Sequence, residues 1–330
     1  MTTYKEAGVD IEAGDEAVKR IGKIVKKSFT ANTLTDIGGF GGCYNFPKDD
    51  YDEPVLVSSA DGVGTKLKIA FLSNRHSTVG QCLVNHCVND ILAVGARPLF
   101  FLDYFATGKL KVGVLEDVVT GLSKACQENN CSLIGGETAE MPGFYQDGEY
   151  DMSGTIVGVV DRKYMLPNKK TAKGDFLIGL PSTGLHTNGY SLARKILLSK
   201  YDVTEFVDEL GCTISDALLA IHKSYLHVAD AILEKEWLRG ISHITGGGIV
   251  NNTKRIIQED QDIDIDWDAW ERPAIYKLIQ KLGDVPEDDL RQSMNLGIGL
   301  ILVVRPDGLN ECLSHLDSLG ETYYELGKVI

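Results

Sequence analysis

A carboxylate, two glycines, a hydroxyl group and an ammonium group occur together in residues 61–66, DGVGTK. This segment comes shortly after the apolar run 55–57, which predicts that it lies at the end of a strand. Glycines let backbone N–H groups close on an anion, a lysine supplies positive charge, and an aspartate can bind Mg²⁺ through oxygen. Because Thr65 precedes Lys66, the order differs from that of a P-loop. The segment predicts either a phosphate and metal site or an ordinary glycine turn.

Two further carboxylates occur in comparable surroundings. Asp90 follows Asn89 where a helical pattern continues into apolar residues, and Glu137 and Thr138 follow a buried-strand pattern and two glycines. A carboxylate in apolar surroundings usually has a cation as its partner. We therefore expect Asp61, Asp90 and Glu137 to share one Mg²⁺ with phosphate oxygens and water. For Asp90 the alternative is a solvated position on the helix surface.

Three turns complete the candidate site. Residues 38–42, GGFGG, predict either a flap that orders over a ligand or a plain loop. Residues 182–191 place His186 and Asn188 before a predicted helix, whose N–H groups can receive phosphate. Residues 243–248 precede another predicted helix and form a second candidate anion site. The alternative for the last two turns is simple entry into a helix.

Composition argues against several classes of partner. The 330 residues, 43% of them hydrophobic, suffice for two ordinary domains or one large one. The formal net charge of -14 makes nucleic acid and anionic membranes poor general partners. The seven cysteines include no C-x-x-C pair, and the chain has neither an apolar leader nor an apolar stretch of roughly 20 residues. We expect a cytoplasmic protein with reduced thiols and no membrane span.

Short apolar runs alternate with helical periodicities, which predicts a mixed α/β or α+β fold. The polar, basic segment 161–174 predicts a boundary between one domain over residues 1–166 and another over residues 170–330. The predicted helices are 76–95, 115–129, a helix from about residue 190, 215–236, 249–258, 273–282 and 307–319. The predicted strands are 98–105, 131–134, 152–160, 176–180, 297–304 and 323–330.

Several stretches together resemble the phosphoribosylformylglycinamidine cyclo-ligase family, also called AIR synthetases, of purine biosynthesis. They lie in the family's order over nearly the whole chain, at residues 7–11, 61–66, 87–90, 98–108, 135–142, 184–191, 243–248 and 295–299. The resemblance implies a two-domain α/β fold in which the N-terminal sheet pairs across a homodimer. It also implies a C-terminal α/β domain and an ATP site in the cleft between the domains.

The resemblance further implies a reaction. ATP would phosphorylate the formyl oxygen of formylglycinamidine ribonucleotide, because an amide oxygen is a poor leaving group. An amidine-derived nitrogen would then attack the same carbon and phosphate would leave, giving 5-aminoimidazole ribonucleotide. Such phosphoryl transfer depends mainly on positioning and on neutralising charge.

Matched residue by residue, the family's catalytic positions fall on Asp61, Asp90, Glu137 and His186. The positions expected to bind the cofactor are Gly41, Gly62, Gly64, Thr65, Lys66, Asn89, Thr138 and Asn188. We assign the three carboxylates to Mg²⁺ and ATP phosphates, Lys66 to a phosphate, and His186 to the reacting amide as donor or proton shuttle. Family members often have a threonine where this chain has Ala60, so one hydroxyl group is missing here.

Other members of the superfamily fit less well. Selenophosphate synthetases usually have a reactive residue near the N-terminus, whereas the first cysteine here is Cys43, and the hydrogenase-maturation relative ends in a cysteine, whereas this chain ends in Ile330. Thiamine-phosphate kinase is weaker because the AIR synthetase stretches span the whole length. A catalytically silent nucleotide-binding scaffold is disfavoured by the carboxylates and by His186. A dinucleotide oxidoreductase is least favoured, because no strand is followed by G-x-G-x-x-G.

Overall fold

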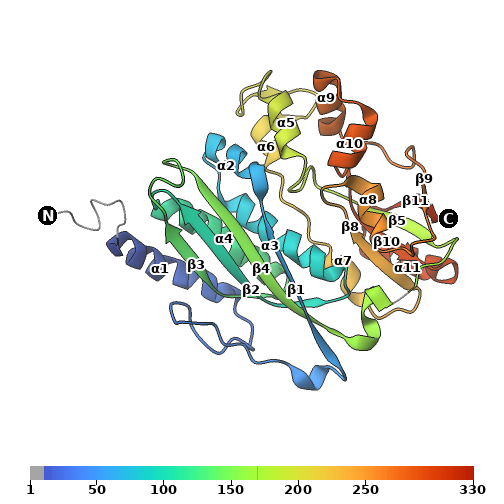
Figure 1. Ribbon diagram of the computed structural model, residues 1–330, viewed down its shortest axis with the longest axis horizontal. Coiled ribbons are helices and arrows are strands. Elements are labelled where there is room, and N and C mark those ends of the chain that lie inside the picture. Colours follow the sequence, from blue (N-terminus) through green and yellow to red (C-terminus); the bar gives the residue numbers. More distant parts are fainter. Residues whose placement is uncertain (1–10, 169) are drawn as a thin grey trace.

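The computed structural model describes residues 11–168 and 170–330, so the predicted match at residues 7–11 lies outside the described part except for Ile11. The first half contains a four-stranded sheet in the order β1-β4-β2-β3, on the left of Figure 1. Strands β2 and β3 are parallel, and the other neighbours are antiparallel. The strands are β1 (Pro54–Gly62), β2 (Arg97–Thr107), β3 (Ser132–Glu140) and β4 (Tyr150–Asp161).

Helices cover one face of this sheet. They are α1 (Ile11–Val25), α2 (Leu67–Ser73), α3 (Ser77–Leu92) and α4 (Val112–Glu128). Along β1 the exposure alternates residue by residue, so Val55 and Val57 pack against the core while Leu56 is 63% exposed on the other face. Helices α3 and α4 approach closely at Gly80 and Gly121, where an added Cβ would lie within 2.2 Å of the backbone of the other helix. This packing fixes α3 against the sheet.

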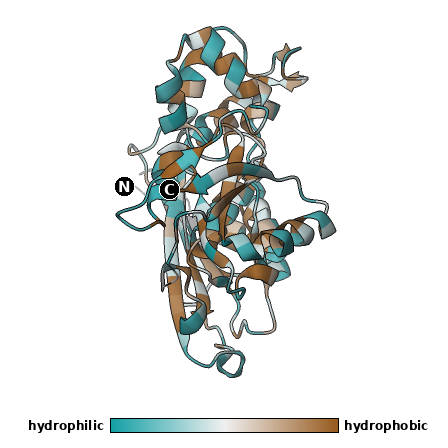
Figure 2. Cartoon of the chain, turned by 90° about the vertical axis from the view of Figure 1, so that its right-hand side faces the viewer, coloured by the Kyte–Doolittle hydropathy of each residue, from teal (hydrophilic) through white to brown (hydrophobic). Residues whose placement is uncertain are grey.

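The second half contains a five-stranded, fully antiparallel sheet in the order β8-β10-β5-β11-β9. Every residue of β10 is buried, because side chains on its two faces enter two different core clusters. Apolar colour gathers along the strands in Figure 2. The strands are β5 (Phe176–Pro181), β8 (Leu238–His243), β9 (Ile263–Ile265), β10 (Ile298–Val304) and β11 (Tyr324–Val329), and a separate pair is β6 (Phe206–Val207) with β7 (Cys212–Thr213).

The helices of the second half lie around this sheet (Figure 1). They are α5 (Tyr190–Leu197), α6 (Ile214–Leu218), α7 (Leu226–Ala229), α8 (Gly248–Lys254), α9 (Ala274–Gly283), α10 (Glu287–Ser293) and α11 (Leu309–Ser318). Among the described helices, none has the length and apolar character needed to cross a bilayer. All seven cysteines lie in the described part and are free.

Helix α3 lies between the two halves and belongs to the packing of both. Its side chains Asn85, His86 and Asn89 are buried although they are polar. Asn85 donates to the carbonyl oxygen of His222 at 2.7 Å, and Asn89 donates to that of Lys223 at 2.8 Å. Polar groups can be buried in this way because each finds a hydrogen-bond partner in the second half. The two halves therefore meet along a polar stripe of α3.

The mixed α/β class is confirmed, and most predicted elements occur within a few residues of their expected bounds. The single helix predicted over residues 215–236 is wrong. The chain instead forms α6, an extended segment, α7 and the 3-10 turn η6 (Asp230–Ile232). The extended segment contains His222, Lys223 and Tyr225, whose backbone groups bond Asn85 and Asn89, so tertiary contacts override the helical pattern.

The predicted domain boundary near residues 166–170 falls between the two sheets, at the 3-10 turn η5 (Leu166–Asn168), and it stays a prediction. Helices α1, α2 and α10 and strands β6, β7, β8 and β9 had no predicted counterpart. The other 3-10 turns are η1 (Lys26–Ser28), η2 (Lys48–Asp50), η3 (Gly64–Lys66), η4 (Arg162–Tyr164) and η7 (Pro306–Gly308).

Candidate active site

A cavity of about 420 Å³ lies where the two halves meet. Its walls come from the end of β1 and the following turn, from His86 of α3, and from the turns at residues 187–188 and 245–246. Asp61, Gly62 and Gly64 line it as predicted, and so does Asn188. Segments separated by more than a hundred residues therefore converge on one space.

Asp61 brings a partly exposed carboxylate to this cavity. Its Oδ2 lies 2.8 Å from Nε2 of His86, and its Oδ1 accepts the N–H of Gly62 at 2.7 Å. Burial raises the pKa of Asp61, but the hydrogen bond and charge of His86 and the Gly62 N–H outweigh burial, so the pKa lies below its usual value. The group is therefore an anion at neutral pH.

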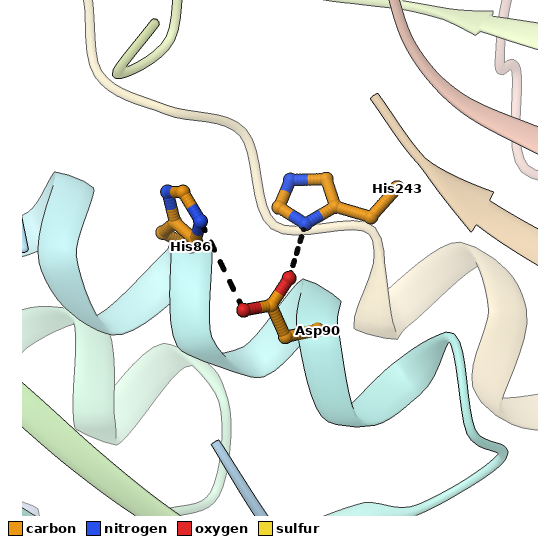
Figure 3. A group of neighbouring side chains, drawn as sticks. All are labelled: His86, Asp90 and His243. Carbon is orange, nitrogen blue, oxygen red and sulfur yellow. Dashed lines mark hydrogen bonds and ion pairs between the residues drawn. The ribbon is translucent and has the colours of Figure 1, made fainter. Parts of the chain in front are cut away.

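Asp90 lies one helical turn after His86 (Figure 3), and its side chain is less exposed than that of Asp61. Its Oδ1 lies 2.8 Å from Nδ1 of His243, and its Oδ2 accepts the hydroxyl of Ser59 at 2.9 Å and lies 3.9 Å from Nε2 of His86. Burial raises the pKa of Asp90, but His243, His86 and Ser59 together lower it below its usual value. Asp61 and Asp90 are thus brought together, joined by His86.

Four histidines surround these carboxylates. The Nε2 atoms of His222 and His243 are 3.1 Å apart, the rings of His186 and His222 stack at 4.0 Å, and Nδ1 of His86 lies 2.6 Å from Oγ1 of Thr187. Burial lowers the pKa of His243, and it holds the pKa values of His186 and His222 well below their usual range. His186, His222 and His243 are therefore neutral at pH 7.

His186 is almost fully buried, in a strained backbone conformation with φ at 59°. Its Nε2 accepts the N–H of Thr183 at 3.2 Å, so in the neutral ring Nδ1 carries the proton. Within residues 11–168 and 170–330, that Nδ1 has no hydrogen-bond partner. Strain and unpaired polar atoms are typical of functional sites. His186 thus has a buried, unpaired donor, and it directly precedes Thr187, which lines the cavity.

Lys66 does not face the cavity. Its side chain is fully buried, and its ammonium group donates to the carbonyl oxygens of His186 and Ala220 at 2.8 and 2.6 Å and contacts the Sγ of Cys82 at 3.1 Å. All three of its protons are used inside the protein. The structure therefore corrects the predicted phosphate contact, and Lys66 ties the turn after β1 to the second half.

Glu137 lies at a different place. With Thr138 and Gly41 it lines a second cavity, of about 750 Å³, next to the glycine-rich loop. Asp61 and Gly136 occupy one row of the sheet, separated by β4 and β2, which places them roughly 14 Å apart. The expectation that three carboxylates meet at one cation is therefore wrong, because β3 delivers its acid to the opposite edge of the sheet.

The second cavity also has Asp103 in its wall. Burial raises the pKa of this carboxyl group to about 7, and no neighbouring charge is among the causes of the shift. The carboxyl group is therefore partly protonated at neutral pH.

The remaining predicted neighbours have different surroundings. Asn89 is buried, and its amide is fully engaged by the second half. Thr65 is exposed, with its hydroxyl 3.2 Å from that of Ser191.

The sequence analysis missed His86 and His222 as site residues. The spacing of four between His86 and Asp90 was a usable signal, because it places both on one helix face, whereas His222 carries no local signal.

Comparison with known proteins places this geometry in a family. Residues 43–160 match the family described as "AIR synthase related protein, N-terminal domain", and residues 172–330 match its C-terminal domain. A phosphoribosylformylglycinamidine cyclo-ligase of Thermoanaerobacter sp. (strain X514) is 46% identical over 329 residues, covering 99% of this chain and 97% of the relative.

Two solved structures share the fold at low identity. A thiamine-monophosphate kinase from Stenotrophomonas maltophilia K279a superposes with a TM-score of 0.71 at 16% identity, covering 93% of this chain and 92% of that one. The hydrogenase maturation protein HypE in complex with ATP gives a TM-score of 0.61 at 18% identity, covering 94% of this chain and 83% of that one. These likenesses establish the fold, and the sequence matches establish more: the chain belongs to the AIR synthase related protein family, together with the phosphoribosylformylglycinamidine cyclo-ligases.

Proposed function

We propose that this chain is a phosphoribosylformylglycinamidine cyclo-ligase. It closes the imidazole ring of formylglycinamidine ribonucleotide with ATP and gives 5-aminoimidazole ribonucleotide, ADP and phosphate. The proposal is supported by the 46% identity over the full chain to a protein of that name. The structural observation that carries it is the cavity at which Asp61, Asn188 and the turn at residues 245–246 converge from both halves.

ATP is the phosphoryl donor in this proposal, and the HypE complex with ATP shows that a protein of this fold binds it. Mg²⁺ in nucleotide sites uses one or two carboxylates together with phosphate oxygens and water. Asp61 and Asp90 fit this requirement, because both have lowered pKa values and Asp61 is exposed to the cavity. When bound there, Mg²⁺ would neutralise phosphate charge. Glu137 is too far away to share it.

The chain's own residues have separable tasks. Gly62 and Gly64 line the cavity, and because the Gly62 N–H is donated to Asp61, the N–H of Gly64 is the one that can receive a phosphate oxygen. The free Nδ1–H of His186 can donate to the formyl oxygen or to the phosphate that leaves from it. Because His186 is neutral, it donates a hydrogen bond without adding positive charge, and it can pass a proton to the leaving group.

The larger cavity at the glycine-rich loop is our proposed place for the nucleoside part of ATP. It has 750 Å³ of space, apolar walls from Val18, Ile21 and Leu133, and polar groups from Glu137 and Thr138. Such a mixture of apolar walls and few polar groups is typical of small-molecule sites. The phosphates would then extend from this cavity toward Asp61.

The decisive experiment mixes the purified protein with Mg²⁺, ATP and formylglycinamidine ribonucleotide, and follows ADP together with the product by mass spectrometry. Loss of one water from the ribonucleotide, with one ADP per ring closed, is the expected result. ATP binding without substrate-dependent ADP release would contradict the proposal and favour a silent nucleotide-binding scaffold.

We further propose a cytoplasmic location, which suits the free thiols.

We also propose a homodimer that pairs through the uncovered face of the first sheet. Leu56 and Tyr104 are exposed on that sheet face, with Leu102 and Val157 half-buried between them. Exposed apolar side chains gathered on one face of a sheet often mark an interface. Size-exclusion chromatography with light scattering should give twice the chain mass, and Leu56→Asp should give the monomer. A wild-type monomer at micromolar concentration would contradict the dimer.

A further inference from the structure

We propose that His86, Asp90 and His243 form a binding site for one divalent transition-metal ion, which shares Asp90 with the proposed Mg²⁺ site and differs from it by two imidazole nitrogen ligands. A transition-metal ion would thus bind where α3 and the end of β8 meet, beside the active-site cavity. It deepens the proposed function, on which its catalytic meaning rests, while metal binding itself can be measured without substrate.

The three side chains come from two elements and point toward one another (Figure 3). His86 and Asp90 are one turn apart on α3, and His243 ends β8. One nitrogen from each ring and one carboxylate oxygen all lie within 4.8 Å of one another. Ligand atoms at about 2.0–2.2 Å from a tetrahedral ion lie roughly 3.3–3.5 Å apart, so the three groups can close on an ion with small side-chain shifts.

Hydrogen-bond directions around Asn89 fix the proton on His222. The Asn89 Oδ1 accepts the backbone N–H of Tyr225 at 3.0 Å, so its nitrogen is the donor toward Lys223 O at 2.8 Å and toward His222 Nε2 at 3.2 Å. His222 Nε2 is therefore an acceptor, and in the neutral ring its proton is on Nδ1. A backbone N–H at a fixed position thus determines the tautomer of a side chain next to the site.

His243 is oriented in a way that suits a metal ligand. Its Nε2 lies 3.1 Å from Nε2 of His222, which gives this nitrogen a partner outside the proposed site. Its other nitrogen, Nδ1, points to Asp90 and lies 2.8 Å from Oδ1. Nδ1 is therefore the atom of His243 that can bind a metal ion together with Asp90.

His86 can supply the second nitrogen ligand of the proposed site. Its Nδ1 lies 2.6 Å from Oγ1 of Thr187, which can accept a hydrogen bond from Nδ1–H, so that Nε2, now 2.8 Å from Oδ2 of Asp61, can turn its lone pair to a metal ion. Metal-bound histidines usually donate their other N–H in this way, which orients the ring. Thr187 contacts the second ring nitrogen of His86, and His222 contacts that of His243. Both candidate ligands therefore have the outer partner that a metal site requires.

The donor set selects the class of ion. Two imidazole nitrogens with one carboxylate suit Zn²⁺, Co²⁺, Fe²⁺ or Mn²⁺, whereas Mg²⁺ prefers oxygen ligands in octahedral geometry. Both rings are nearly buried, while Asp61 and His86 also face the 420 Å³ cavity. That side leaves room for water or a substrate oxygen as a further ligand, as in catalytic rather than purely structural metal sites.

The test uses Co²⁺ alone, because its visible absorption reports ligand geometry. The full-length protein is treated with chelator, dialysed, and titrated with Co²⁺ while absorption and heat are recorded. We expect one ion per chain, bound at least tenfold more tightly than Mg²⁺. His86→Ala, His243→Ala and Asp90→Asn should each weaken Co²⁺ binding by at least about tenfold, because removal of even an outer partner costs that much.

His227→Ala is the matched control, because His227 is an exposed histidine that bonds Glu321 on the surface, and it should bind Co²⁺ as the wild type does. Circular dichroism shows whether each variant folds, and Asp90→Asn, which keeps the side-chain volume, decides the question if a histidine variant does not fold. No Co²⁺ binding by the wild type, equal affinities for Co²⁺ and Mg²⁺, or unchanged binding in folded His86→Ala would each overturn the inference.

The cyclo-ligase assay on the same chelated preparation separates the two proposals. Full ADP release in Mg²⁺ by a protein that does not bind Co²⁺ would leave the proposed function intact and overturn the metal site. One tightly bound Co²⁺, lost in His86→Ala, in a protein that releases no ADP with substrate would support the metal site and contradict the proposed function.

Discussion

Replacing Asn89 by alanine tests how α3 holds the two halves together. The side chain makes three hydrogen bonds to the second half, to the N–H of Tyr225, the carbonyl oxygen of Lys223 and Nε2 of His222. It is fully buried, so solvent does not replace the lost partners freely. At about 1 kcal/mol for each bond, with unsatisfied buried partners adding to the loss, Asn89→Ala should lower the free energy of unfolding by roughly 3 kcal/mol.

The magnitude can be measured in two ways. The unfolding entropy of a 330-residue chain is roughly 0.7 kcal/mol/K, so a single cooperative transition should move down by about 4 °C. Urea unfolding followed by circular dichroism should give the same loss of free energy. Asn251→Ala is the control, because Asn251 is an exposed asparagine on α8, and surface changes are usually within about 0.5 kcal/mol. If Asn89→Ala cost no more than this control, the polar stripe would not hold the halves together.

Three further predictions concern single residues. Lys66→Met should lower the melting temperature but leave the KM for ATP within about twofold, because its protons are used internally; a rise in KM with unchanged stability would restore the phosphate contact. Asp90→Asn should keep the fold by circular dichroism yet reduce turnover at least tenfold, about 1.4 kcal/mol in the barrier, and unchanged ADP release would remove Asp90 from the reaction. The folded pKa of Asp103, about 7, exceeds its ordinary value of 3.8, so its favourable contribution is full below pH 3.8 and is lost as the pH rises toward 7. Asp103→Asn should therefore gain stability relative to the wild type between pH 5 and pH 8, on the order of 2 kcal/mol, and a pH-independent difference would contradict this.

The sequence predicted the elements that have a strong internal pattern. Helix α3 and strands β2, β4 and β10 were found because their apolar residues recur regularly and proline or glycine bounds them. The helix predicted over residues 215–236 failed for a physical reason. Its middle is held extended by Asn85 and Asn89, which are more than a hundred residues away, and no local pattern contains that information.

The candidate site could be predicted only in part, because local patterns do not contain the long-range arrangement of the strands. Asp61 and Asp90 meet because β1 and α3 are adjacent, and their resemblance to family positions identified both. Glu137 follows a buried strand just as Asp61 does, but which edge of the sheet a strand occupies depends on strand order, which single-strand patterns do not specify. Lys66 shows the opposite case, since a glycine-rich turn with a lysine looks like a phosphate site until its carbonyl partners are seen.

The buried polar stripe of α3 restricts how this chain can be divided. An isolated fragment ending at the predicted boundary would expose the amides of Asn85 and Asn89 beside the apolar core residues Leu92 and Val88. Such a fragment would lack the partners of its central helix and would be prone to aggregation. Separately expressed pieces should therefore become soluble only when produced together, by complementation across this helix. Any rearrangement that widens the active site would likewise have to exchange these buried amide contacts for water.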